Sequence, residues 1–418
     1  MSEKYKKRQI FPKIIELLKI PETIVLHGSR QVGKTTLIKM TVDYLENKEV
    51  TNIFYFDLEK PEDLELCNRG VDDMISYMQI RLKKSQKSEN SKIFVFIDEI
   101  QYLDNPSSLL KLFYDHHKND YKLMVSGSSS FAIKSKFKDS LVGRIIDLEI
   151  FGLSFQEFLH FKGKHYNLSE NIDPTNKSTL ELKKLYREYA IFGFYPQVVL
   201  ATTIEDKQMY LNGIIDKYIN KDIKDLANIK NINKFNNLLQ FLAAEAGQLV
   251  NISELSNTLN IARQTIEEYL FILENSYIIK IIYPFHKNIR SELTKMPKIY
   301  FEDTGILNIL KNKKIIPLID GQLFENSIYN YLRRTYKVKN IYFWRTLAKQ
   351  EVDFILDQGK PFPLEVKIKY NGKHIKSLLY FGKKYNLDNL YCVAFEKNPD
   401  ATHKNIIQLY PWEIDKII

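Results

Sequence analysis

A glycine-rich segment at residues 28–35 constrains the fold of this chain more than any other part of the sequence. It reads Gly-Ser-Arg-Gln-Val-Gly-Lys-Thr and fits the pattern G-x-x-x-x-G-K-[ST] without deviation. An apolar run at 22–27 precedes it and predicts a buried strand, while residues 34–45 favour a helix. Between a strand and a helix, the glycines let backbone N–H groups curl around a phosphate at the helix N-terminus. The segment therefore predicts a phosphate-binding loop.

The ligand that this loop predicts is ATP with Mg²⁺. We expect the Lys34 ammonium to reach the β and γ phosphates, and the Thr35 hydroxyl to ligate Mg²⁺. The full set of expected nucleotide-binding residues is Gly28, Ser29, Arg30, Gln31, Val32, Gly33, Lys34, Thr35 and Thr36.

Two adjacent carboxylates, Asp98 and Glu99, end a later apolar strand predicted at 92–97. Asp98 is expected to hold Mg²⁺, and Glu99 to polarise the attacking water as a general base. The alternative is a strand that ends in a solvated acidic loop. Beside a phosphate loop, the pair predicts hydrolysis of the nucleotide.

Two further residues are candidates for the same reaction. Ser128 lies in the run 126–130, which follows a predicted strand at 122–125, and could sense the γ phosphate. Arg144 could stabilise transition-state charge in its own chain or in a neighbouring subunit. An ordinary serine-glycine loop and an ordinary surface arginine remain open as alternatives.

The arrangement of apolar runs predicts an α/β fold in the first 150 residues. Besides the strands already described, strands are expected at 52–56 and 145–148, and helical segments separate them. This alternation indicates βαβ units and a P-loop NTPase fold with a mostly parallel sheet. Residues 151–235 are mostly helical in pattern and predict a lid.

The character of the sequence changes after residue 235. Residues 236–315 contain two short amphipathic helices, at 253–259 and 263–273, and then a β-prone run at 277–283. That order is typical of a winged helix-turn-helix. Residues 316–418 predict a small α/β domain, which we expect to fold alone because about 100 residues is an ordinary domain size.

Composition sets limits on location and partners. The chain has 418 residues, two distant cysteines and a net charge of +10, and no apolar run approaches the roughly 20 residues that cross a bilayer. The polar N-terminus lacks the apolar core of a secretory signal, so a cytoplasmic location without a membrane partner is expected. Residues 321–418 hold 16 basic and 10 acidic residues, so most of the charge excess lies there. Such an excess suits a nucleic-acid backbone or simply solubility.

Several motifs in one order carry a resemblance to a known group. Besides the phosphate loop they are Phe96-Ile-Asp-Glu-Ile-Gln101, Ser126-Gly-Ser-Ser-Ser130, Leu141-Val-Gly-Arg144, Leu153-Ser-Phe-Gln-Glu-Phe158, Gly193-Phe-Tyr-Pro196, Phe324-Glu-Asn326, Glu351-Val-Asp-Phe354 and Glu365-Val-Lys367. Together they resemble a large prokaryotic group of AAA-type ATPases. The resemblance covers nearly the whole chain. It implies an AAA-type core at 1–150, a helical lid at 151–235, a winged helix at 236–315 and a nuclease-like fold at 316–418, without a substrate.

The last segment also contains the D…E-x-K pattern of PD-(D/E)xK nucleases, in Asp353, Glu365 and Lys367. Two carboxylates on one Mg²⁺ and a lysine beside the attacked phosphate would serve that chemistry. If a hairpin centres on Gly359, positions 353 and 365 lie opposite each other, and alternation puts Glu365 and Lys367 on one face. Glu325 could add a ligand. An active nuclease, a nuclease-like fold kept only for binding, and neither of these remain open.

Candidate nucleic-acid contacts lie in both of the last two segments. Arg263, Gln264 and Thr265 open the second helix of the helix-turn-helix, although Glu267 and Glu268 follow and would repel phosphates. The last domain offers Lys337, Lys339, Trp344, Arg345, Lys367 and Lys369.

The sequence as a whole predicts a nucleotide-driven switch or motor that hydrolyses ATP and is directed to DNA through its C-terminal half. One rival is a signalling-type ATPase whose winged helix and last domain bind protein partners. A second rival is an ATP-gated, Mg²⁺-dependent nuclease. Self-association is also left open.

Overall fold

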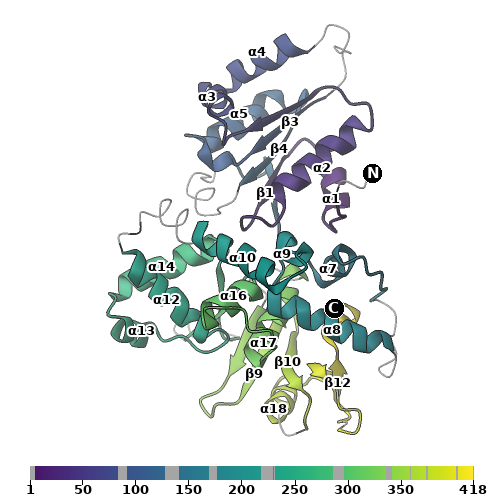
Figure 1. The fold of residues 1–418 in the computed structure, drawn as a ribbon, viewed down its shortest axis with the longest axis vertical. Helices are drawn as coiled ribbons and strands as arrows, with labels where there is room; N and C mark the ends of the chain where they lie inside the picture. The colour runs from purple at the N-terminus through teal and green to yellow at the C-terminus, as the bar shows by residue number, and fades with distance from the viewer. Residues whose placement is uncertain are drawn as a thin grey trace. The chain divides into compact units, whose positions relative to one another are not determined.

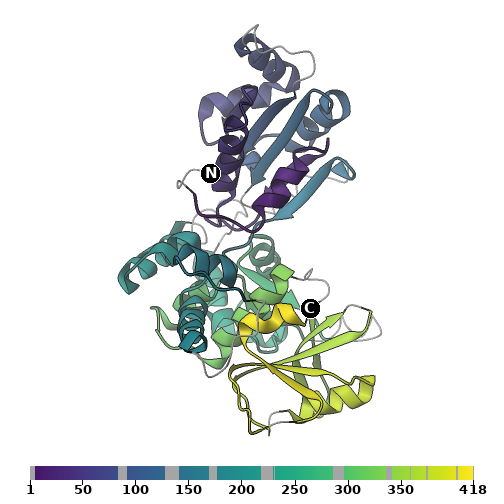
Figure 2. The same ribbon diagram turned by 90° about the vertical axis from the view of Figure 1, so that its right-hand side faces the viewer.

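The computed structural model describes residues 5–82, 92–127, 141–168, 177–217, 229, 231–285, 296–335, 341–357, 359–372, 375–401 and 403–417. The chain divides into two compact units, which Figures 1 and 2 show as ribbons. Unit 1 is 1–152 with 275–277, and unit 2 is 153–274 with 278–418. In the described ranges, no helix is long and apolar enough to cross a membrane.

Unit 1 is built around a five-stranded sheet with the order β2-β3-β4-β1-β5, in which every pairing is parallel. The strands are β1 (Thr23–His27), β2 (Ile53–Asp57), β3 (Ile93–Asp98), β4 (Tyr121–Gly127) and β5 (Ile145–Glu149). The helices are α1 (Phe11–Leu17), α2 (Lys34–Glu46), α3 (Pro61–Arg69), α4 (Val71–Arg81) and α5 (Pro106–His117).

This sheet matches the P-loop NTPase fold and confirms the five strands predicted from apolar runs, each within two residues. The strands read as continuous apolar runs because helices cover the sheet and little of it faces water. In β4 all seven residues are buried. Val25, Val95 and Val125 from the three central strands pack in one core with Phe113 of α5.

Unit 2 contains ten α-helices among the described residues and a second sheet. The helices are α7 (Phe155–Phe161), α8 (Lys177–Phe192), α9 (Pro196–Leu200), α10 (Ile204–Ile214), α12 (Ile232–Ala244), α13 (Ile252–Leu259), α14 (Arg263–Asn275), α16 (Thr304–Asn312), α17 (Gly321–Thr335) and α18 (Lys376–Tyr385). The strands are β6 (Ile279–Ile282), β7 (Lys298–Phe301), β8 (Ile341–Arg345), β9 (Glu351–Asp357), β10 (Pro361–Lys369), β11 (Leu390–Glu396) and β12 (Ile406–Leu409).

Helices α13 and α14 occupy the two segments predicted as short amphipathic helices. Asn251 caps α13 by accepting from the backbone N–H groups of Ser253 and Glu254, and Asn260 ends it in the left-handed conformation (φ 51°). Strands β6 and β7 follow and pair antiparallel. The order of two helices and a two-stranded β ribbon is therefore the predicted one.

The second sheet has the order β12-β11-β10-β9-β8. Strands β9 and β10 form an antiparallel hairpin in which Leu364 lies opposite Phe354 and Phe362 opposite Leu356. Both pairs are centred on Gly359, whose φ of 89° suits a tight turn that only glycine adopts easily. The predicted register of this hairpin is confirmed. Strands β11 and β12 continue the sheet in parallel.

One hydrophobic core extends through all three of the segments predicted after residue 150. It includes Phe155 of α7, Tyr186 of α8, Tyr300 of β7, Phe324 of α17 and Trp412 of the 3₁₀ helix Pro411–Lys416. The Trp412 ring lies 6.2 Å from the Phe155 ring and 6.1 Å from the Tyr186 ring, centroid to centroid. Independent folding of residues 316–418 is therefore not expected, because that segment completes a core whose other half lies at 153–200.

We predict that a fragment of residues 316–418 fails to fold, whereas residues 153–418 melt cooperatively. Without α7 and α8 the fragment would expose Phe324 and Trp412 to water, each worth about 3 kcal/mol of lost burial. Thermal melting followed by near-ultraviolet circular dichroism measures this. A cooperative melt of the short fragment would contradict the shared core.

Candidate functional site

The glycine-rich loop of unit 1 joins the end of β1 to the start of α2 in a conformation that glycine makes accessible. Gly28 has φ 142° and Gly33 has φ 103°. A Cβ atom on Gly28 would lie 2.2 Å from the Ile150 carbonyl oxygen, so no side chain fits there. The backbone therefore turns sharply after β1, and α2 begins at Lys34 directly behind the loop.

Arg8 fastens this loop from outside it. One guanidinium nitrogen donates to the Val32 carbonyl at 2.7 Å and another donates to the Phe151 carbonyl at 2.9 Å. The side chain is buried, with 8% of the residue exposed. The sequence pattern missed Arg8 because it lies in a polar, lysine-rich stretch 20 residues before the loop, where an arginine carries no motif.

The Lys34 ammonium is buried in the loop that contains it. Its Nζ donates to the Gly28 carbonyl at 3.0 Å and to the Ser29 carbonyl at 2.8 Å. Burial lowers the pKa of Lys34 to about 8, and the nearby carboxylates of Glu99 and Asp98 oppose that shift. Thr35 is partly exposed and Thr36 is exposed. The loop thus concentrates positive charge where the helix N-terminus and the backbone N–H groups also favour an anion.

Asp98 and Glu99 lie at the same edge of the sheet as the loop, because the strands are parallel and Asp98 ends β3. Asp98 is 3% exposed and accepts hydrogen bonds from the Ser126 hydroxyl and, at 3.1 Å, from the Tyr55 hydroxyl. The Glu99 carboxylate accepts from the Gln101 side-chain amide. Two neighbouring strands, β2 and β4, therefore hold the Asp98 carboxylate in place, while Gln101 holds that of Glu99.

The backbone of Glu99 is itself unusual. Its φ of 57° and ψ of 50° place it in the left-handed region, which a residue with a Cβ adopts at a cost of order 1 kcal/mol or more. The Glu99 N–H lies 3.3 Å from the Ser126 hydroxyl. Strain of this kind is common where a structure must aim a functional side chain.

Electrostatic coupling extends from the carboxylate pair to its neighbours. Burial and the charge of Asp98 raise the pKa of the Tyr55 hydroxyl. Burial, followed by Glu99 and Asp57, raises the pKa of Glu59. Tyr55 and Gln101 belong to the site but were missed by sequence reasoning. Gln101 lay in the motif at 96–101, but no role was predicted for it. Nothing in the sequence distinguishes Tyr55 from the other residues of its predicted strand.

Two of the predicted catalytic residues have different outcomes. Ser128 lies outside the described residues, and within the described part of the serine run Ser126 is the residue that contacts Asp98. Arg144 directly precedes β5 and its carbonyl accepts from the Thr23 N–H at the start of β1, so it lies at the opposite edge of the sheet. There its Nε lies 2.7 Å from Asp115 Oδ1. The structure therefore does not bring Arg144 to the phosphate loop of its own chain, and a role in a neighbouring subunit stays a prediction.

In unit 2 the structure brings Asp353, Glu365 and Lys367 together. The Lys367 ammonium lies 2.6 Å from Glu365 Oε1 and 3.1 Å from Asp353 Oδ2, and the latter oxygen accepts from the Val366 N–H at 2.8 Å. Glu365 is 4% exposed, and its Oε2 is buried without a hydrogen-bond partner. Burial, followed by the charge of Asp353, raises the pKa of Glu365 to about 8.

Glu325 joins this group from α17, and β7 supplies residues that the sequence pattern missed. The Glu325 carboxylate accepts from the Tyr300 hydroxyl at 2.6 Å, and burial with Asp353 raises the pKa of Glu325 to about 7. The buried Lys298 ammonium lies 2.5 Å from Glu351 Oε1 and 3.8 Å from Glu325 Oε1. Across the described ranges no three His, Cys, Asp or Glu side chains are grouped to hold a metal ion.

The helix-turn-helix candidates make contacts within their own helix. Arg263 Nε lies 3.0 Å from Glu267 Oε1, and the Gln264 side-chain amide donates to Glu268 at 3.4 Å. These are exposed pairs one helical turn apart, and such pairs are weak. Lys337 and Lys339 lie outside the described residues.

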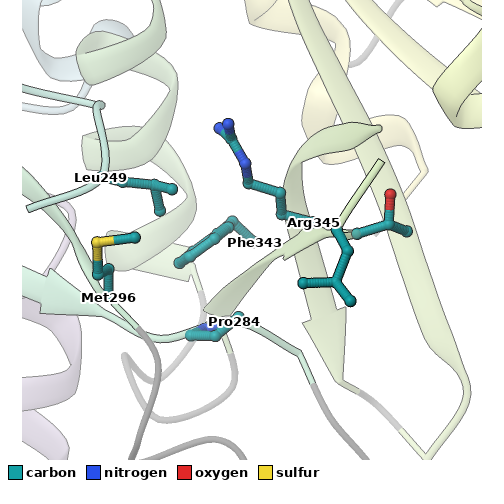
Figure 3. Close-up of a pocket in the computed structure, with 7 residues that line it drawn as sticks. Leu249, Pro284, Met296, Phe343 and Arg345 are labelled. Carbon is teal, nitrogen blue, oxygen red and sulfur yellow. The ribbon is translucent and has the colours of Figure 1, made fainter. Parts of the chain in front are cut away.

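An apolar pocket of about 300 Å³ lies beside β8 (Figure 3). Its lining residues are Leu249, Pro284, Met296, Phe343, Arg345, Thr346 and Leu347. Arg345 is the charged residue among the described ones that line it, and its guanidinium lies 2.5 Å from Glu351 Oε2. The pocket therefore adjoins the pair Lys298–Glu351 through one further ion pair, Arg345–Glu351.

Comparison with known families assigns three segments of the chain. An AAA domain matches residues 21–159, and domains of unknown function match residues 183–315 (DUF8612) and 320–414 (DUF4143). An uncharacterised protein of Haemophilus influenzae is 29% identical over 343 residues, covering 79% of this chain and 78% of that protein. One of Methanocaldococcus jannaschii is 28% identical over 415 residues, covering 96% and 88%.

Among solved structures, a Walker-type ATPase of Pyrococcus abyssi is similar at 13% identity and a TM-score of 0.44, covering 74% of this chain and 96% of that one. The family match to 21–159 agrees with the parallel sheet and the glycine-rich loop of unit 1. That segment is therefore similar to AAA domains, as the sequence motifs predicted.

We predict that Arg8→Met weakens nucleotide binding. The change removes two charge-assisted hydrogen bonds that fasten the loop, and each such bond is worth about 1.5–3 kcal/mol. The dissociation constant for ATP, measured by calorimetry, should rise at least roughly tenfold. Arg69→Met is the matched control, because Arg69 is an exposed arginine paired with Glu65. Equal affinities of the two variants would contradict the role of Arg8.

Proposed function

We propose that the chain binds ATP with Mg²⁺ and hydrolyses it at the glycine-rich loop of unit 1. The observation that carries this proposal is the buried Lys34 ammonium, held by loop carbonyls and coupled to Asp98 and Glu99 at one edge of a parallel sheet. A buried ammonium that has lost hydration is stabilised by an anion, and the loop offers backbone N–H groups to the same ligand. The family match to AAA domains supports this reading.

The donor set fits a nucleotide-bound Mg²⁺. Thr35 supplies a hydroxyl and Asp98 a carboxylate, which are the hard oxygen ligands that this ion prefers. When bound, the ion neutralises charge on the phosphates. Lys34 holds the terminal phosphates, and Glu99 accepts the proton of the attacking water. Ser126 and Tyr55 orient Asp98, and Gln101 orients Glu99.

Through ATP hydrolysis the protein acts as a nucleotide-driven switch or motor, and its C-terminal half directs it to DNA. The charge excess of residues 321–418 supports a nucleic-acid partner. The helix pair α13–α14 and the ribbon β6–β7 follow the order of a winged helix, although the exposed acidic residues of α14 suit a protein partner as well.

We predict that Glu99→Gln binds ATP but hydrolyses it at least roughly 100-fold more slowly, the size of a general-base contribution. Lys34→Ala should instead lose affinity. Single-turnover hydrolysis and fluorescent-nucleotide titration separate the two effects. Glu65→Gln, an exposed glutamate on α3, is the control. Hydrolysis at the wild-type rate by Glu99→Gln would show that another group is the base.

The second candidate function is metal binding, with or without phosphodiester cleavage, at Asp353, Glu365 and Lys367. The orphaned Oε2 atom of Glu365 favours it, because a buried carboxylate oxygen without a donor is unfavourable unless a cation or proton meets it. Lys367 already balances part of the charge. Two carboxylates with Glu325 nearby suit a nuclease-like fold that is active or kept only for binding.

We predict that Mn²⁺ raises the melting temperature of the nucleotide-free chain, and that Asp353→Ala abolishes the rise. Asp357→Ala, an exposed position on the same strand, should keep it. Differential scanning fluorimetry measures the shift, and plasmid nicking with Mg²⁺ then tests cleavage. A rise that survives in Asp353→Ala would place the metal elsewhere.

A further inference from the structure

A run of residues in the last quarter of the chain is basic without any acidic residue. Between 366 and 387 there are six lysines and no aspartate or glutamate. Helix α18 lies in this run and carries three of the lysines, Lys376, Lys383 and Lys384. In the described part of the chain no carboxylate oxygen lies within 4.0 Å of their ammonium groups. Their charge is therefore available to a partner.

The lysines occupy one face of the helix. Its buried face consists of Leu378, Phe381 and Gly382, and a Cβ atom on Gly382 would lie 2.9 Å from the Leu390 methyl groups, so α18 lies close against β11. The helix also packs against β9 and β10 (Figure 1). Positions 376, 380, 383 and 384 are exposed and fall within about 100° of arc on the opposite side. We call these four residues the α18 stripe.

An aromatic ring lies in the middle of the α18 stripe. Tyr380 is 47% exposed, although large hydrophobic rings are usually covered. Its ring stacks on the buried Trp344, with centroids 6.0 Å apart and an interplanar angle of 28°. Lys384 Nζ lies 5.5 Å from the centre of the same Trp344 ring. The stacking on Trp344 thus fixes the orientation of the Tyr380 ring. A ligand that stacks on this ring therefore costs little side-chain conformational entropy.

Helix stability alone does not account for the stripe. Lys383 and Lys384 lie in the last turn, where a cation interacts favourably with the helix dipole. Lys376 is the first residue of the helix, where the dipole disfavours a cation, and the first turn contains no acidic residue. Tyr380 contributes to the packing of α18 through Trp344, but that contact leaves 47% of the residue exposed between these lysines. Lysines at both ends of α18, with the Tyr380 ring between them, instead suit a ligand that carries several negative charges and flat bases.

We propose that the α18 stripe binds single-stranded nucleic acid, with the three lysines on successive phosphates and Tyr380 stacked on an unpaired base. Base stacking on an aromatic ring combined with lysines along the backbone is how sequence-tolerant single-strand sites are built. The inference rests on the nucleic-acid part of the proposed function, and it names the surface and the kind of strand. The winged-helix segment is not needed for it.

The test is fluorescence anisotropy of the full chain with a labelled DNA strand of roughly 20 nucleotides, its RNA equivalent and the DNA duplex, at several salt concentrations. The wild-type chain should prefer the single strands. Replacing all three stripe lysines by glutamine should lower the slope of log affinity against log salt by about 2, since each phosphate contact on a single strand contributes about 0.7. Tyr380→Ala should weaken single-strand binding roughly 5- to 100-fold, and Tyr380→Phe should not.

The control removes the same charge elsewhere in unit 2, through Lys184→Gln, Lys314→Gln and Lys360→Gln, all at exposed positions. It should keep the wild-type salt slope. If the wild-type chain binds nucleic acid and the stripe variant binds with the same affinity and slope, the inference is overturned while the nucleic-acid role survives. If the wild-type chain binds neither strand nor duplex, both are overturned. Melting temperatures within a few degrees of wild type show that the variants are folded.

Discussion

The structure of unit 1 depends on burying one ammonium group at the carboxyl edge of a parallel sheet. Removing a lysine charge from water is unfavourable, and the loop offsets that with two carbonyl contacts and two nearby carboxylates. Each requirement acts on the rest of the fold. The loop curls, and Gly28 lies against Ile150. The carboxylates lie at the same edge of the sheet as the loop because β3 and β1 run parallel, with β4 between them. Arg8 then fixes the loop through its hydrogen bonds to the carbonyls of Val32 and Phe151.

Unit 2 also contains charged groups that are removed from water, and it compensates them differently. Its buried carboxylates Asp353 and Glu365, and the partly buried Glu325 and Glu351, are met by the ammonium groups of Lys298 and Lys367 from two separate strands. These charges are therefore largely balanced by the chain itself, and among the described, fully buried oxygens of the group Oε2 of Glu365 lacks a hydrogen-bond donor. In unit 1 a single buried ammonium is held by loop carbonyls near two carboxylates, whereas in unit 2 the carboxylates outnumber the ammonium groups that pair with them.

The sequence predicted those features that local patterns encode. The glycine loop, the five strands of unit 1 and the hairpin register about Gly359 follow from turn chemistry and from periods of apolar residues, which act over a few residues. Arg8, Tyr55 and Lys298 escaped prediction because their partners lie far away in sequence, as in the 143 residues between Arg8 and Phe151. Arg144 was misplaced for a related reason. Its neighbourhood in sequence resembles a motif, but the parallel topology puts it at the other end of β5.

The core shared by α7, α8, β7, α17 and the second sheet joins these elements of unit 2 in one close-packed body. Close-packed interiors compress little and transmit strain, so a displacement imposed on α8 would appear at the far side of the second sheet with little loss. Bending this core would require separating Phe155 and Tyr186 from Trp412, whose ring centroids lie 6.2 and 6.1 Å away.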